Sequence, residues 1–160
     1  MRPPEDPEVL VFFVDANLLG VAKSLEAVRN DILYPGHTSC PTIVPATPDS
    51  KWLAEAGRRQ WIVILRDKRV RSRSREREAL LQHGLRTFCL TGSGNASSWD
   101  SLRLLAIHWP DIERVARESP GPFIYSVTRE GVKPLTLGRP AVRKRRPPRQ
   151  GMLPIRVPPQ

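Results

Sequence analysis

The chain is 160 residues long and 39% hydrophobic, which suits one domain with a buried core. Its net charge of +10 comes mainly from one end, because nine basic residues and one acid lie from Arg129 onward. We therefore predict a flexible lead-in over 1–8, a folded domain over 9–128, and a disordered, basic and Pro-rich tail over 129–160.

Composition also argues against two classes of protein. No apolar run approaches the length of a membrane span, and the first residues lack the apolar core of a secretory signal. Cys40 and Cys89 do not have the spacing of a zinc site, and Cys89 lies in an apolar run typical of a buried thiol. We expect a cytoplasmic protein with reduced thiols and no membrane contact.

The first half of the chain opens with a continuous apolar run, typical of a strand buried on both faces of a parallel sheet. We place this strand over 9–14, and the apolar periodicity that follows predicts a helix over 16–29. Pro-Gly and Cys-Pro pairs predict a loop over 31–45, with a short strand near 42–44. The segment 47–50 (Thr-Pro-Asp-Ser) then opens a second helix, which ends near Gln60.

The second half repeats this alternation of strands and helices. We expect a strand over 61–65, a charged loop over 66–77, and a helix over 76–83 that is stopped by Gly84. A strand over 85–90 and a Gly/Asn-rich loop over 91–96 should follow, and then helices from Ser97 or Ser98 to His108 and over 110–117. The last predicted element is a strand over 123–128, with little fixed structure after Gly131. Short strands alternating with helices predict an α/β sandwich with a mainly parallel sheet.

Three acids fall at positions that such a sheet brings to one edge. Asp15 follows the first strand, Asp67 follows the strand at 61–65, and Asp49 begins the helix that leads into that strand. Ligands of open α/β sheets bind at the carboxyl ends of the strands. Carboxylates are the oxygen ligands that Mg²⁺ and Mn²⁺ prefer, so we predict a metal site in which Asn17 orients a ligand or a water.

Each acid also has a purely structural interpretation. An acid after a strand is often a turn or cap residue, which would suffice for Asp15. Asp49 lies where capping and the helix dipole favour an acid. Asp67 can pair with the basic residues beside it. The sequence leaves these alternatives open.

Arginine recurs at every second position of the loop that contains Asp67. We predict that this loop holds RNA phosphates through Lys68, Arg69, Arg71 and Arg73, because the planar guanidinium grips phosphate. The alternative is a solvated, charged loop. With 6% aromatic residues, no base-stacking surface stands out, and we expect the four tryptophans to be core or helix-packing residues: Trp52, Trp61, Trp99 and Trp109.

Three motifs in this order resemble a known family. They are Phe-Val-Asp-Ala-Asn-Leu (13–18), Pro-Asp-Ser-Lys-Trp-Leu-Ala-Glu-Ala-Gly (48–57) and Trp-Ile-Val-Ile-Leu-Arg-Asp-Lys-Arg (61–69). Together they look like a PIN-like domain, and most resemble the branch that includes VapC-type toxins. The resemblance covers the body of the chain and not its tail.

The resemblance implies a three-layer α/β/α fold and a metal-dependent endoribonuclease, with Mg²⁺ or Mn²⁺ at Asp15, Asp49 and Asp67. It also implies an RNA substrate and a cognate antitoxin, and it is compatible with a homodimer. The sequence departs from the family pattern at Arg69, where related sequences often have a further acid. Asp100 is a candidate for the fourth acid, or else a structural residue of a helix's first turn.

Two other functions fit part of the pattern. A non-catalytic PIN-like module with an incomplete acidic site would bind RNA or a protein, and the basic residue at position 69 is what favours it. A receiver-like phosphoacceptor domain also uses acids at the sheet edge, but it expects an acidic pair where Asp15 stands alone.

Overall fold

The computed structural model describes residues 9–66, 74–92 and 96–135. They form one six-stranded sheet in the order β2-β1-β3-β4-β5-β6, parallel throughout except for the pairing of β5 with β6. The strands are β1 (Phe12–Val14), β2 (Ile32–Leu33), β3 (Ile62–Leu65), β4 (Arg86–Leu90), β5 (Phe123–Thr128) and β6 (Gly131–Pro134). The predicted mainly parallel sheet is confirmed.

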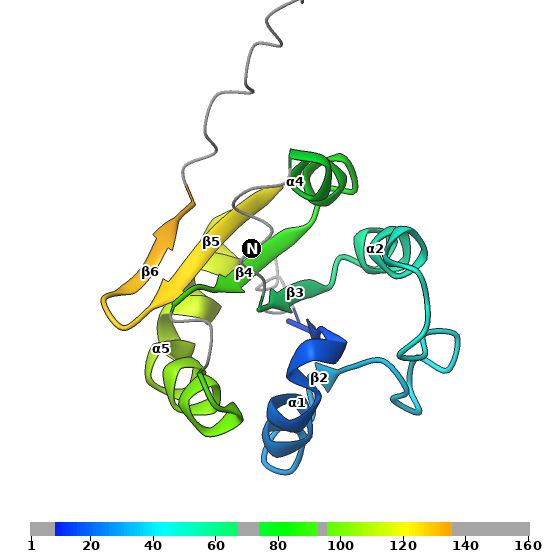
Figure 1. The fold of residues 1–160 in the computed structure, drawn as a ribbon. Coiled ribbons are helices and arrows are strands. Elements are labelled where there is room, and N and C mark those ends of the chain that lie inside the picture. The colour runs from blue at the N-terminus through cyan, green and yellow to red at the C-terminus, as the bar shows by residue number, and fades with distance from the viewer. Residues whose placement is uncertain (1–8, 67–73, 93–95, 136–160) are drawn as a thin grey trace, which may run out of the picture.

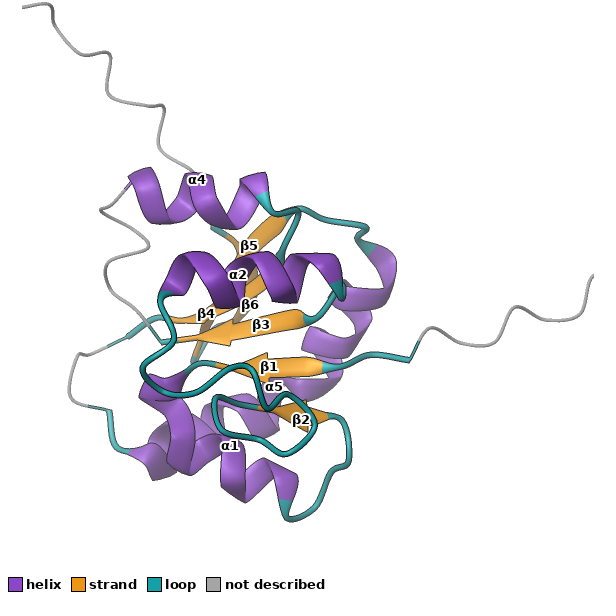
Figure 2. Ribbon diagram, turned by 90° about the vertical axis from the view of Figure 1, so that its right-hand side faces the viewer, coloured by secondary structure: helices purple, strands orange, loops and turns teal. Residues whose placement is uncertain are grey.

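Helices cover both faces of this sheet, which gives the three layers expected from the resemblance (Figures 1 and 2). The helices are a 3-10 turn η1 (Ala16–Leu18), α1 (Leu19–Glu26), α2 (Asp49–Arg58), α4 (Ser74–Gln82) and α5 (Ser98–Glu118). Helices α1 and α5 pack on one face, and α2 and α4 pack on the other. Within these described stretches of chain, no helix combines the length and the apolar character needed to cross a membrane.

Strand β1 lies at the centre of the core. Phe12 and Val14 join the hydrophobic cluster under α1 and α5, whereas Phe13 joins the cluster under α2 and α4. This alternation is the period of two of a strand, and here both faces are apolar because helices cover both. The ring of Phe13 stacks on Trp52 of α2 and on Trp61, with centroid distances of 5.3 and 5.4 Å.

The order of the strands places a topological switch point beside β1. The chain leaves β1 toward β2 on one side and returns to β3 on the other. The carboxyl ends of β1, β3 and β4 therefore share one edge of the sheet with the first turns of α2 and α5 (Figure 2). Open α/β sheets bind ligands in the crevice at such an edge.

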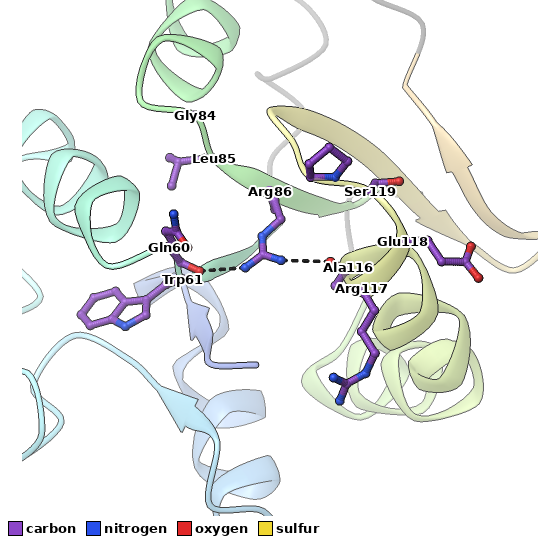
Figure 3. A pocket seen from close by; sticks show the side chains of 10 residues that line it. Gln60, Trp61, Gly84, Leu85, Arg86, Ala116, Arg117, Glu118 and Ser119 are labelled. Carbon is purple, nitrogen blue, oxygen red and sulfur yellow. Dashed lines mark hydrogen bonds between the residues drawn. The ribbon is translucent and has the colours of Figure 1, made fainter. Parts of the chain in front are cut away.

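The opposite edge holds a cavity of about 380 Å³ around the buried Arg86 (Figure 3). Its guanidinium donates hydrogen bonds to the carbonyl oxygens of Ala116 at 2.9 Å and Gln60 at 3.0 Å. The cavity is far from the carboxyl edge, and its central cation already binds backbone acceptors. We therefore assign it a structural role, in which Arg86 ties the end of α5 to the turn before β3.

Helix α5 corrects one prediction of local structure. The sequence predicted a break before Pro110, but one helix runs through this residue. Proline inside a helix removes a hydrogen bond and costs about 3 kcal/mol. The ring of Pro110 is exposed, and the buried residues Trp109, Ile112 and Val115 continue the same face, so packing on the sheet outweighs that cost.

Two edge strands were also predicted wrongly. The strand next to β1 is β2 at 32–33, not 42–44, and the backbone N–H of Phe12 donates to Asp31 at its start. Ile43 is buried in the cluster under α2 without pairing in the sheet. Strand β6 lies where little fixed structure was expected, and it pairs antiparallel with β5 through a two-residue turn. Short edge strands like these carry little apolar pattern.

Candidate functional site

Asp15 lies directly after β1 and remains tied to the neighbouring strand. Its backbone N–H donates to the carbonyl oxygen of Ile64 in β3 at 3.0 Å. Its side chain caps the following 3-10 turn, since Oδ1 accepts from the backbone N–H of Ala16 at 2.8 Å. Oδ2 accepts from the side-chain amide of Asn17 at 3.1 Å. The carboxylate is therefore oriented by one donor on each oxygen.

The surroundings of Asp15 are unfavourable for a bare carboxylate. Burial raises the pKa of Asp15, and the nearby charge of Asp49 raises it further. The hydrogen bonds from Ala16 and Asn17 act in the opposite direction but do not outweigh burial and repulsion. Burial is the main cause of this raised pKa, and a cation beside the carboxylate would favour its charged form.

Asp49 lies near enough for its charge to act on Asp15, because the first turn of α2 lies at the same edge of the sheet. It is the first residue of α2, and its Oδ1 accepts a hydrogen bond from Nε1 of Trp52 at 2.8 Å. Trp52 is buried and stacks on Phe13, two residues before Asp15. One indole thus packs on the strand that carries the first acid and orients the carboxylate of the second.

The loop that leads to Asp49 is held against the end of α1. The carboxylate of Glu26 accepts from the hydroxyl of Tyr34 at 2.8 Å and contacts Nε2 of His37 at 3.0 Å. The backbone N–H of Ser39 donates to Nδ1 of His37 at 2.9 Å, which leaves Nε2 to carry the proton in a neutral ring. These contacts limit the freedom of the segment that positions Asp49.

Several predicted site residues cannot be placed. The predicted ligand Asp67 and the predicted phosphate contacts Lys68, Arg69, Arg71 and Arg73 lie outside the described residues. Across the described ranges 9–66, 74–92 and 96–135, no three His, Cys, Asp or Glu side chains gather to hold a metal ion. A three-acid site would therefore have to include a residue outside the described ones, and Asp67 is the predicted candidate. The last described residue before it is the half-exposed Arg66, directly after β3.

Asp100 acts as part of a helix cap. Ser97 and Asp100 form a reciprocal capping box at the start of α5, in which Oδ2 of Asp100 accepts from the Ser97 hydroxyl at 2.9 Å. These hydrogen bonds lower the pKa of Asp100, and the charges of Arg103 and Arg129 lower it further. The geometry agrees with the structural alternative for Asp100, since its charge is already matched by donors and cations.

Two features of this edge were not recognised in the sequence. The first is the hydrogen bond that the indole of Trp52 donates to Asp49. The signal for it was the i, i+3 spacing of these residues in a predicted helix, which brings such side chains together. Trp99, expected in the core or in helix packing, is instead 65% exposed in the first turn of α5. Its exposure depends on how α5 is rotated on the sheet, which local sequence does not reveal.

The oxygen atoms at this edge fit as ligands of a hard divalent cation. Asp15 and Asp49 provide carboxylate oxygens, and the amide nitrogen of Asn17 donates to the carboxylate of Asp15. Mg²⁺ and Mn²⁺ prefer oxygen ligands and commonly need only a few carboxylates plus water. The soft ligands lie elsewhere, because Cys40 and Cys89 are buried thiols in the core. Whether Asp15, Asp49 and Asp67 are ligands stays a prediction.

Comparison with known proteins identifies the family of this chain. The model of the family described as "PIN like domain" matches residues 10–92, which include β1, α2 and β3. A protein of Mycobacterium tuberculosis named "Putative ribonuclease VapC45" is 34% identical over 86 residues, which are 54% of this chain and 61% of that protein. No solved structure matches the chain. The family match covers more than half of the chain, so this protein belongs to the PIN-like domain family.

Proposed function

We propose that this protein is a Mg²⁺- or Mn²⁺-dependent endoribonuclease that hydrolyses phosphodiester bonds in RNA. The proposal extends to a role as the toxin of a type II toxin–antitoxin pair. Its support is the PIN-like family match and the likeness to a protein named as a ribonuclease of the VapC type. The match spans 61% of that relative, so the activity and partners of the whole relative enter here only as a proposal.

The observation that carries the proposal is that Asp15 and Asp49 lie at the same edge of the sheet, beside its switch point. They are 34 positions apart in the sequence, and the charge of Asp49 still acts on the Asp15 carboxylate. A carboxylate at the sheet edge whose pKa is raised by burial and by a second acid is typical of functional sites.

In the proposed reaction, Asp15, Asp49 and Asp67 hold the cation, and Asn17 keeps Asp15 oriented through its amide. The bound ion would supply a polarised phosphate and a water of lowered pKa. Arg66 and the basic residues Lys68, Arg69, Arg71 and Arg73 would position the RNA backbone. Such contacts fix the register of the strand on the protein without selecting a base.

The decisive experiment measures cleavage of RNA by the purified chain with each metal. Asp15→Asn, Asp49→Asn and Asp67→Asn should each lower the cleavage rate by at least about 100-fold, since even outer partners of metal ligands are worth about 10- to 100-fold. Asp111→Asn is the matched control, because Asp111 is an acid on α5 that pairs only with Arg114 in the described chain. Full activity of the Asp15 and Asp49 variants would refute the proposal.

The proposed cognate antitoxin is an inhibitor that covers the acidic edge. Co-expression of the chain with the product of a neighbouring small reading frame should give a complex that no longer cleaves RNA. Size-exclusion chromatography of the same sample would also decide between a monomer and a homodimer of the chain.

A second function is favoured by the small number of acids that meet at the site. Over the part of the chain that the structure describes, only a pair of acids approaches, and Asp100 is engaged as a cap. A non-catalytic RNA-binding module would have such a site. Calorimetric titration with Mn²⁺ separates the two functions, since a module would bind no metal and would bind RNA equally well with a chelator present.

A further inference from the structure

An exposed tryptophan stands at the edge of the sheet that carries the acids. Trp99 is 65% exposed, whereas Trp52, Trp61 and Trp109 are buried. A large aromatic side chain left in solvent loses the free energy that burial would provide. Ser97 and Asp100 lie on either side of Trp99 in the sequence, and the capping box that they form fixes this turn of the helix.

The first turn of α5 is also close to the segment that follows Asp15. A Cβ atom on Gly20, at the start of α1, would lie 3.7 Å from Oγ of Ser98. Only η1 and Leu19 separate Asp15 from this glycine. Figure 2 shows the starts of α2 and α5 at the edge where β1 and β3 end. The helix turn that carries Trp99 thus lies at the same edge of the sheet as Asp15 and the start of α2.

The charges around Trp99 suit a nucleic acid. Arg103 lies one turn further along α5 and is exposed, and both Arg103 and Arg129 lie close enough to Asp100 to lower its pKa. Arg103 makes no ion pair with the described residues. An aromatic ring beside exposed cations is the combination that binds single-stranded nucleic acid, by stacking a base and holding the adjacent phosphate.

We propose that Trp99 stacks on an unpaired base of the RNA substrate and that Arg103 contacts the neighbouring phosphate. This inference rests on the proposed ribonuclease function and adds to it a defined base-binding position. A base within a duplex cannot stack on Trp99, because both of its faces are covered. The position therefore favours single-stranded RNA over double-stranded RNA at the acidic edge.

The competing explanation is an apolar surface for a protein. Ile107, two turns further along α5, is 66% exposed and could share such a surface with Trp99. The cations beside Trp99 favour a phosphate-bearing ligand, and Ile107 is a matched control of equal exposure on the same helix.

The test measures binding of a fluorescent single-stranded oligonucleotide and of its duplex by anisotropy, in a chelator that prevents cleavage. Trp99→Ala should weaken binding of the single strand by roughly 5- to 150-fold. Trp99→Phe should retain most of the affinity, since it keeps an aromatic ring. Ile107→Ala should bind the single strand within about twofold of the parent, and duplex binding should change little in all three variants.

The other outcomes overturn the inference in distinguishable ways. If the parent cleaves RNA with Mn²⁺ but Trp99→Ala binds the single strand as tightly as the parent, the stacking role is wrong and the ribonuclease remains. If the parent neither binds nor cleaves RNA, both proposals are wrong. If Trp99→Ala and Ile107→Ala both disrupt self-association in light scattering while RNA binding is unchanged, the surface docks a second copy of the chain.

Discussion

The link between Trp52 and Asp49 can be tested with one substitution. Trp52→Phe keeps an aromatic ring against Phe13 but removes the indole N–H that donates to Asp49 at 2.8 Å. A hydrogen bond to a charged acceptor is worth about 1.5–3 kcal/mol when buried, and less here because Asp49 is exposed and water can replace the donor. We take about 1 kcal/mol, which corresponds to a roughly fivefold loss of Mn²⁺ affinity and of kcat/KM.

The matched control is Trp61→Phe, because Trp61 is the other tryptophan that stacks on Phe13. Trp61 is 5% exposed and Trp52 is 6% exposed, and both stack on Phe13. Each substitution should lower the free energy of unfolding by about 1–3 kcal/mol through lost packing, measured in urea. Only Trp52→Phe should weaken Mn²⁺ binding in calorimetry. Equal losses of metal affinity in both variants, or none in either, would show that the indole N–H does not orient Asp49.

Three further predictions concern charge. Burial and the charge of Asp49 raise the pKa of Asp15 in the folded chain. The favourable contribution of Asp15 to stability is therefore fully present below the pKa that it has in the unfolded chain, and it is lost as the pH rises through the pKa that it has in the folded chain. Without metal, Asp15→Asn should therefore melt above the parent at pH 7, and calorimetry should show this advantage disappearing near pH 3.5. Arg86→Met removes donors to two carbonyl oxygens at 2.9 and 3.0 Å, and urea unfolding should show a loss of about 3–5 kcal/mol. Arg103→Gln should reduce the slope of log K against log salt for RNA binding by about 1, whereas Arg114→Gln should not, because Arg114 already pairs with acids on its own helix.

Local sequence was enough to locate many elements of the fold. The run of apolar residues before Asp15 predicted a strand buried on both faces, and Phe12, Phe13 and Val14 are fully buried. Gly84 was predicted to stop a helix in the left-handed region, and its φ is +70°. Ser97 was one of two predicted caps, and it does cap α5. These features depend on interactions within a few residues, so they can be read from neighbouring side chains.

The sequence also determined which residue types are available for chemistry. Three short motifs resembled a PIN-like domain, and the family match agrees with that resemblance. The sequence could not decide between a cap and a ligand for Asp15 or Asp100, because both roles use the same side chain at the same position. The tertiary structure shows what surrounds each side chain: Asp15 is half-buried, caps η1 and is acted on by the charge of Asp49, whereas Asp100 is matched by Ser97 and by cations.

Long-range packing decided the remaining features. Helix α5 continues through Pro110 because its buried face extends to Val115, and the pairing of β1 with β2 depends on an edge that no local pattern marks. The rotation of α5 on the sheet leaves Trp99 in solvent, although its type favours the core. Each of these outcomes is set by contacts between segments far apart in the chain, whose free energies exceed the local preferences of the residues involved.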